Sequence, residues 1–279
     1  MEARSIATPV IEWLAAGDGH ARGAMRGATH GATYLDLGGV VVAVTRRGVP
    51  LMPNGIAVDH APVVAGGAVR AAPGRLDVGS ARVTWDAARP PAWEPAPRRP
   101  SPTARPALER RGTAILRALG IDGPPSIDGG IAVTVRGRGQ DGARHLRRAI
   151  VDRDPDEAAR SAERLIGLGD GLTPEGDDVL AATAATVAAL GDAVGFAPAT
   201  RDRWLAALVP SDVRERTTPL SATLLQLAIQ GRIAQPVHPL LDTAHTRWRD
   251  ALARLEGVGA STGRAYAVSV GSAMRLLTA

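Results

Sequence analysis

The chain has 279 residues, of which 45% are apolar and only 3% aromatic, so it is long enough for two domains whose cores consist mainly of Ala, Val and Leu. The net charge is +5, but all 33 basic residues are arginines interleaved with acids, and stacking aromatics are scarce, so we expect no nucleic-acid partner. The lack of lysine excludes a Walker A loop and Schiff-base chemistry, and the lack of cysteine excludes a thiol nucleophile.

Membrane and secretion signals are also missing from the sequence. No apolar run approaches the roughly 20 residues that cross a bilayer. The first ten residues show no basic region followed by an apolar one, which a secretory signal would need. We therefore expect a cytoplasmic protein without a membrane partner.

The first third of the chain is predicted to be rich in β-strands. Residues 38–45 form a β-branched run bounded by glycines, and residues 51–58 hold the single asparagine of the chain next to a glycine, which indicates a turn. Residues 75–85 alternate apolar and polar side chains around Gly79 and Ser80, the pattern of a two-residue hairpin. Residues 88–106 are dense in proline, which favours a linker.

Helical patterns dominate after this segment. Asp154 precedes Pro155 and a first turn rich in acids, which predicts an N-cap and a helix to residue 166. Residues 131–135 are expected to form a strand. The other expected helices cover residues 107–119, 177–190, 200–209, 219–230, 244–256 and 262–277. The predicted fold is therefore α+β, with a β-rich N-terminal domain (1–90), a proline-rich linker (91–106) and a mainly α-helical C-terminal domain (107–279).

The stretch G-L-G-D-G-L-T-P-E-G-D-D, residues 167–178, leads into the predicted helix 177–190. Its four glycines permit positive φ angles and close approach of a ligand, and a helix N-terminus offers free N–H groups to an anion. The acids could cap the helix or hold Mg²⁺. A plain helix–loop–helix connection explains the capping residues equally well, but it does not require four glycines and two adjacent acids together.

This stretch strongly resembles the signature of a bacterial family named after the AllH subunit of oxamate carbamoyltransferase. Two further stretches fit the same family, T-T-P-L-S-A-T-L-L-Q-L-A-I-Q-G (217–231) and G-V-G-A-S-T-G-R-A-Y-A-V-S-V-G (257–271). Two residues depart from the family pattern. The family has a small residue at the position of Glu175, and it has an ending of the Gly-(small)-Asp type where this sequence has Arg264 and Ala265.

The resemblance implies a subunit of a carbamoyltransferase of the oxamate type. Such an enzyme moves a carbamoyl group between an oxamate-like amide and phosphate during the breakdown of allantoin, a product of purine catabolism. Its partners would be small anions, namely carbamoyl phosphate, phosphate and the oxamate-like substrate, together with the other transferase subunits. The alternative is a non-catalytic assembly or anion-binding subunit of a multi-protein complex.

The expected catalytic residues are Asp177 and Asp178, which could shuttle a proton or bind Mg²⁺ as the only cofactor considered. For Thr218 and Ser261 a plain role as helix N-caps is favoured over ligand binding. The anion site depends on the fold bringing three helix N-termini together. The residues expected to line it are Gly169, Gly171, Leu172, Thr173, Gly176, Thr217, Thr218, Ser221, Ser261, Thr262 and Gly263.

Overall fold

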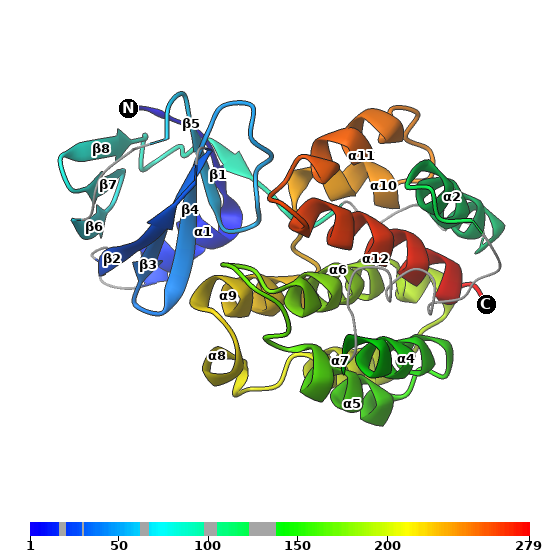
Figure 1. The fold of residues 1–279 in the computed structure, drawn as a ribbon. Coiled ribbons are helices and arrows are strands. Elements are labelled where there is room, and N and C mark those ends of the chain that lie inside the picture. The colour runs from blue at the N-terminus through cyan, green and yellow to red at the C-terminus, as the bar shows by residue number, and fades with distance from the viewer. Residues whose placement is uncertain (17–20, 30, 62–66, 98–104, 123–137) are drawn as a thin grey trace. The chain divides into compact units, whose positions relative to one another are not determined.

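The computed structural model describes residues 1–16, 21–29, 31–61, 67–97, 105–122 and 138–279. The chain divides into two compact units, Met1–Pro95 and Ala96–Ala279 (Figure 1). The first is built on a sheet and the second consists of helices, so the predicted α+β class is confirmed. The exact domain and linker boundaries given by the sequence stay a prediction.

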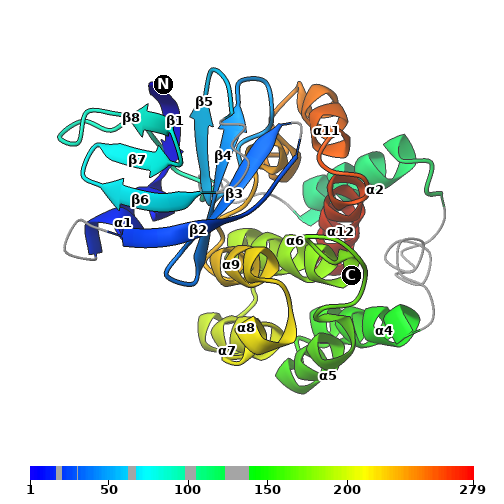
Figure 2. The same ribbon diagram turned by 60° about the vertical axis from the view of Figure 1, so that its left-hand side comes forward.

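The N-terminal unit contains one curled sheet in the order β8-β7-β6-β2-β3-β4-β5-β1-β9 (Figure 2). The pairs β4–β5 and β1–β9 are parallel, and the others are antiparallel. One helix, α1 (Thr8–Ala16), follows the first strand. The strands are β1 (Ala3–Ala7), β2 (Ala21–Ala28), β3 (Ala32–Leu37), β4 (Val40–Arg46), β5 (Gly55–Val58), β6 (Ala68–Ala72), β7 (Arg75–Val78), β8 (Ala81–Thr84) and β9 (Ala92–Trp93).

Strand β2 explains how the sheet curls. Its first half, Ala21–Ala24, pairs with β6, and its second half, from Ala24 to Ala28, pairs with β3. One strand therefore belongs to both parts of the sheet (Figure 2). The hairpin expected around Gly79 is confirmed, because β7 and β8 close with Val78 opposite Ala81.

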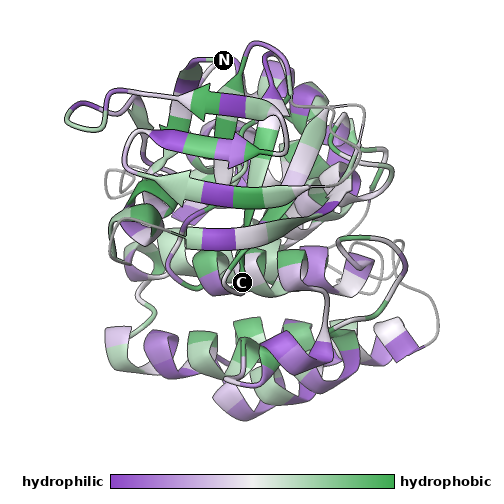
Figure 3. Cartoon of the chain, turned by 90° about the vertical axis from the view of Figure 1, so that its left-hand side faces the viewer, coloured by the Kyte–Doolittle hydropathy of each residue, from purple (hydrophilic) through white to green (hydrophobic). Residues whose placement is uncertain are grey.

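The core of this unit is aliphatic, as the composition requires. Ile6, Leu35, Ile56 and Leu76 are fully buried within it. Hydrophilic and hydrophobic residues alternate along several strands of the sheet, so that one set can face the core (Figure 3). The single asparagine, Asn54, is also buried, and its amide donates a hydrogen bond to the Val41 carbonyl at 2.8 Å.

The second unit is organised around two helices that are buried along most of their length, α6 (Glu175–Leu190) and α12 (Thr262–Leu276), which pack against each other. A helix that is apolar on all sides belongs in the centre of a bundle. The surrounding helices are α2 (Arg105–Ala118), α4 (Arg138–Val151), α5 (Pro155–Leu165), α7 (Pro198–Leu208), α8 (Val213–Arg216), α9 (Pro219–Ala228), α10 (His238–Leu241) and α11 (Trp248–Glu256).

The expected helices are present, and Asp154 caps α5 by accepting a hydrogen bond from the Asp156 amide at 2.8 Å. Helix α1 of the first unit and helices α4, α8 and α10 of the second are additional to those expected. The strand expected at residues 131–135 lies outside the described residues. Within the part of the chain that the structure describes, none of the helices combines the length and apolar character needed to cross a membrane.

Candidate functional site

The glycine-rich stretch forms a tight loop between α5 and α6. Gly167, Gly169 and Gly171 have φ angles of 70°, 119° and 92°, which side chains other than glycine rarely adopt. Helix α6 begins at Glu175, two residues earlier than expected, with Pro174 at its N-cap position and no side-chain cap. A Cβ on Gly176 would lie 2.1 Å from the Leu165 carbonyl oxygen, so this position requires glycine.

Asp177 joins the loop to a distant segment. Its side chain is buried, with 2% of the residue exposed, and its Oδ1 accepts a hydrogen bond from the Gly167 amide at 2.9 Å. The Thr217 hydroxyl donates to Oδ2. Burial raises the pKa of Asp177, while the hydrogen bonds from Thr217 and Gly167 and the nearby Ser221 hydroxyl favour the charged form. One carboxylate oxygen of Asp177 therefore binds the loop and the other binds the segment before α9, so the two segments are held together.

Asp178 lies in a different environment although it is the next residue. It is also 2% exposed, and its Oδ2 has no hydrogen-bond partner among the described residues. Burial, reinforced by the negative charges of Asp177 and Glu175, raises the pKa of Asp178 to about 8, and the hydroxyls of Thr262 and Thr173 act in the opposite direction. This carboxyl group is therefore mostly protonated at neutral pH, and one of its oxygens is left without a hydrogen bond by the described part of the chain.

Three helix N-termini meet around this pair. The Thr218 hydroxyl, at the N-cap of α9, accepts from the Ser221 amide at 3.1 Å and donates to the Leu172 carbonyl at 2.6 Å. The Thr173 and Thr262 hydroxyls are 2.9 Å apart, which joins the loop to the first turn of α12. The structure thus brings together the starts of α6, α9 and α12, the arrangement on which the expected anion site depends.

Not all of the expected site residues have the free groups that an anion needs. The Gly176 amide donates to the Leu168 carbonyl at 2.8 Å, and the Asp177 and Asp178 amides donate to the Pro174 carbonyl at 3.0 and 3.2 Å. The amides of Gly176, Asp177 and Asp178 at the start of α6 therefore already donate hydrogen bonds to backbone carbonyls of the same chain. Gly169, Gly171 and Leu172 are exposed at the loop tip, with Leu172 41% exposed.

The remaining expected residues lie at the start of α12. Ser261 is exposed at the N-cap position and makes no side-chain capping bond. Gly263 is buried, and its amide donates to the Val258 carbonyl at 2.9 Å. A Cβ there would meet the Leu255 carbonyl oxygen at 1.8 Å, so Gly263 permits close packing of the chain. These contacts are structural, and an anion-binding role for Ser261 and Gly263 stays a prediction.

Tyr266 is a neighbour of the pair that the sequence did not point to as a site residue. It is buried in α12, and its pKa is raised well above the usual value by burial and by the negative charges of Asp178 and Asp177. It follows Thr262 by four residues, so both side chains lie on the same face of the helix. The four-residue spacing from Thr262 was the sequence signal that could have identified Tyr266 as a neighbour of the site.

Metal binding by Asp177 and Asp178 was one of the expected alternatives. No three His, Asp or Glu side chains gather in a metal-binding group anywhere in the described ranges. Both Asp177 oxygens accept hydrogen bonds from the protein, and Asp178 is mostly protonated at neutral pH. These contacts favour hydrogen bonding over Mg²⁺ coordination by the pair, and a metal requirement stays a prediction.

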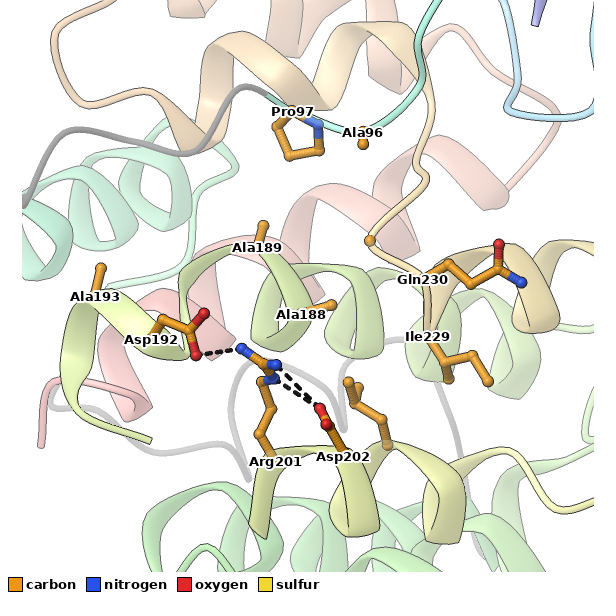
Figure 4. Close-up of a pocket in the computed structure, with 12 residues that line it drawn as sticks. Ala96, Pro97, Ala188, Ala189, Asp192, Ala193, Arg201, Asp202, Ile229 and Gln230 are labelled. Atoms are coloured by element: carbon orange, nitrogen blue, oxygen red, sulfur yellow. Dashed lines mark hydrogen bonds and ion pairs between the residues drawn. The ribbon is translucent and has the colours of Figure 1, made fainter. Parts of the chain in front are cut away.

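The loop does not line any of the three pockets described for this structure. One of these, of about 630 Å³, lies at the other end of α6 and includes Ala188, Asp192, residues of α7 and the turn that follows α9 (Figure 4). In it, Arg201 forms ion pairs with both Asp192 and Asp202. Since two carboxylates already compensate this arginine, it offers little attraction to a substrate anion.

The comparisons with known proteins bear on the same part of the chain. Searches with the whole chain gave no match among curated proteins and none among solved structures. A family model does match, and the matched segment runs from the last residue of α5 to Met274 in the last turn of α12, so it includes every residue of the loop and of the two helix starts that meet it. Over residues 165–274, the chain matches the family described as oxamate carbamoyltransferase subunit AllH.

Proposed function

We propose that this chain is a subunit of a carbamoyltransferase of the oxamate type and that the junction of α6, α9 and α12 contributes to its active site. One observation carries the proposal. The family match covers the three segments that the structure ties together through Asp177, Thr173 and Thr218, although they are far apart in the sequence. The cytoplasmic location and the role in allantoin and purine breakdown expected from the sequence belong to the same proposal.

The reaction sets clear demands on the site. A phosphate oxygen attacks the carbamoyl carbon, the tetrahedral intermediate carries an oxyanion, and the bond from carbon to the oxamate-type nitrogen breaks. The departing nitrogen then needs a proton. Asp178 is a suitable donor, because its burial keeps it protonated at neutral pH and one of its oxygens has no partner among the described residues. In the reverse direction the same carboxylate accepts the proton.

Asp177 has a different role in this proposal. Its two oxygens are occupied by the Gly167 amide and the Thr217 hydroxyl, so it positions the loop and does not react. The Thr173 and Thr262 hydroxyls lie beside Asp178 and can orient its carboxyl group or donate to the oxyanion. Phosphate and the oxamate-like substrate would approach from the exposed tip of the loop at Gly171 and Leu172.

A second candidate function is an assembly subunit that completes an active site on another protein. One observation favours it, namely that the first amides of α6 are engaged by the chain itself, so that the cations and free N–H groups that phosphate needs would have to come from a partner. The exposed Leu172 at the loop tip offers an apolar contact for such a partner.

The test is a carbamoyl-transfer assay in both directions, with the purified chain alone and with its partner subunits. The informative variant is Asp178→Asn, and the control is Asp170→Asn, which removes an exposed carboxylate from the same loop. If Asp178 carries the proton, its replacement lowers kcat by about 10²–10⁴-fold, whereas the control keeps the rate of the wild type within about twofold. In the direction in which Asp178 donates its proton to the departing nitrogen, the wild-type rate falls as the pH rises through about 8, because Asp178 then loses that proton.

The two functions give different results. Wild-type rates for Asp178→Asn in the complete complex would rule out the proton-donor role. Wild-type rates for this variant, together with failure of the complex to form without the chain, would support the assembly function. Activity of the isolated chain supports the catalytic function directly.

A further inference from the structure

We propose that the chain has a second binding site, for a small ligand that carries phosphate groups, in an arginine-lined pocket between α2 and α11. This site uses none of the residues around Asp177 and Asp178 and does not depend on the proposed transferase activity. Both helices belong to the C-terminal unit (Figure 1). The pocket has a volume of about 660 Å³, which is within the range of ligand sites of about 300–1,000 Å³.

The positions of the lining residues follow from helix geometry. Arg110, Thr113, Ala114 and Arg117 are spaced at i, i+3, i+4 and i+7, so they share one face of α2. The small Ala114 and Ala118 side chains leave room between the two arginines of this helix. Arg249, in the first turn of α11, contributes a third guanidinium group. Glu109 is the single acid among the described residues that line the pocket, so in this set three positive charges face one negative charge.

Among the residues that the structure describes, these arginines have few acidic partners. Across the described residues, Arg110 forms no ion pair or hydrogen bond. Arg117 approaches Asp122 at 3.9 Å, with both side chains largely exposed, which is a weak ion pair in water. By contrast, Arg26 forms a close ion pair with Asp36 at 2.6 Å. A concave surface lined by charges of one sign concentrates its field and attracts counter-ions.

Arg249 is held in place by an aromatic ring. Its guanidinium group lies 4.5 Å from the centre of the Trp248 ring, and the Arg111 guanidinium lies 5.2 Å from the same ring. Trp248 is buried, and Arg111 donates hydrogen bonds to the backbone carbonyls of Pro239, Asp242, Thr243 and His245. The ring beneath Arg249 is therefore fixed, so less conformational entropy is lost when this arginine binds an anion.

The ligand class follows from the donor set. A guanidinium group presents parallel N–H donors that match two oxygens of a phosphate, and three such groups suit a ligand with several charged oxygens better than a single carboxylate. The Thr113 hydroxyl can donate one more hydrogen bond. The pocket size admits a diphosphate or a small organic phosphate. An acidic protein segment is a different class of ligand, and the test below distinguishes it from a phosphate compound.

The test uses the full chain and inorganic pyrophosphate as the probe, with calorimetric titration at low and high salt. The wild type should bind pyrophosphate more tightly than acetate, and 0.5 M NaCl should weaken the binding by at least about tenfold, because screening acts on exposed charges. A triple variant, Arg110→Gln/Arg117→Gln/Arg249→Gln, should lose at least about tenfold in affinity. The control triple variant, Arg148→Gln/Arg203→Gln/Arg254→Gln, makes the same change in net charge at exposed helical positions that do not line the pocket and should stay within about threefold of the wild type.

Each result has a defined meaning. An equal loss of affinity in both triple variants, or no pyrophosphate binding by the wild type, overturns the proposal. Binding of an acidic peptide such as poly-glutamate, without binding of pyrophosphate, also overturns it in favour of a protein ligand. The double variant Asp177→Asn/Asp178→Asn should bind pyrophosphate like the wild type, so failure of the transferase proposal and failure of this one can be told apart. Thermal unfolding of every variant confirms that the fold is kept.

Discussion

Replacement of Asp178 by asparagine should make the stability of the protein less dependent on pH. The folded state holds a proton on this buried carboxyl group up to about pH 8, whereas the unfolded chain releases it near the ordinary value of 3.8. Between these values the folded state binds one proton more than the unfolded state, so the free energy of unfolding decreases as the pH rises. Asparagine has nearly the same shape and stays neutral, so the variant lacks this decrease.

The magnitude follows from the linkage relation. Each pH unit between the two pKa values costs the wild type ~1.4 kcal/mol, so the variant should gain ~3 kcal/mol relative to the wild type between pH 5 and pH 7. Urea unfolding at pH 5, 6 and 7 measures this difference. The exposed Asp170→Asn serves as the control, and its difference from the wild type should stay nearly constant over the same range.

One result would refute the reasoning. If the difference between Asp178→Asn and the wild type changes by less than about 0.5 kcal/mol from pH 5 to pH 7, the carboxyl group is already charged at pH 5, since a full proton would give about six times as much. The Thr173 and Thr262 hydroxyls would then stabilise the charged form of Asp178 more than burial destabilises it. Asp178 would carry no proton at neutral pH and could not act as the proton donor.

Three further variants test the packing around the site and the helical core. Gly176→Ala should lower the free energy of unfolding by about 3 kcal/mol or more, because the added Cβ would lie 2.1 Å from the Leu165 carbonyl oxygen. Gly171→Ala should cost only about 1 kcal/mol, because its φ is positive but the space around it is open. Urea unfolding compares the two, and equal effects would contradict the described backbone. Arg111→Met should lower the free energy of unfolding by about 3 kcal/mol, and with it the melting temperature, because four partly buried carbonyl groups lose a charged donor. An unchanged melting temperature would show that water replaces this donor without cost.

Local signals explain which parts of the fold could be predicted from the sequence. The β7–β8 hairpin and the start of α5 depend on neighbouring residues, namely the Gly79-Ser80 pair and the Asp154 cap, so the sequence was sufficient. Helix α4 was missed because glycines interrupt its pattern. Gly142 in this helix is required by packing, since a Cβ there would lie 2.6 Å from Leu165 Cγ. Strand β2 was missed because it contains no β-branched residue and is held by pairing on both sides.

The candidate site was predictable in its composition but not in its bonding. The sequence identified the loop, the two acids and the hydroxyl-bearing helix starts, all of which meet in the structure. It could not show that the Gly176 amide is used by the Leu168 carbonyl, because that depends on how the loop closes. Nor could it distinguish Asp177 from Asp178. Their difference arises from which oxygen faces Thr217 and which has no partner among the described residues.

The hydrogen bonds that hold the loop also determine when it can form during folding. Thr217 lies 40 residues from Asp177, Thr218 lies 46 residues from Leu172, and Thr262 lies 89 residues from Thr173. Contacts over such separations cost chain entropy before they contribute stability, so they form after the helices that carry them have docked. The loop should therefore be among the last parts of the helical unit to become ordered. Slow exchange of the Gly167 amide hydrogen, which Asp177 accepts, would then report that the whole unit has assembled.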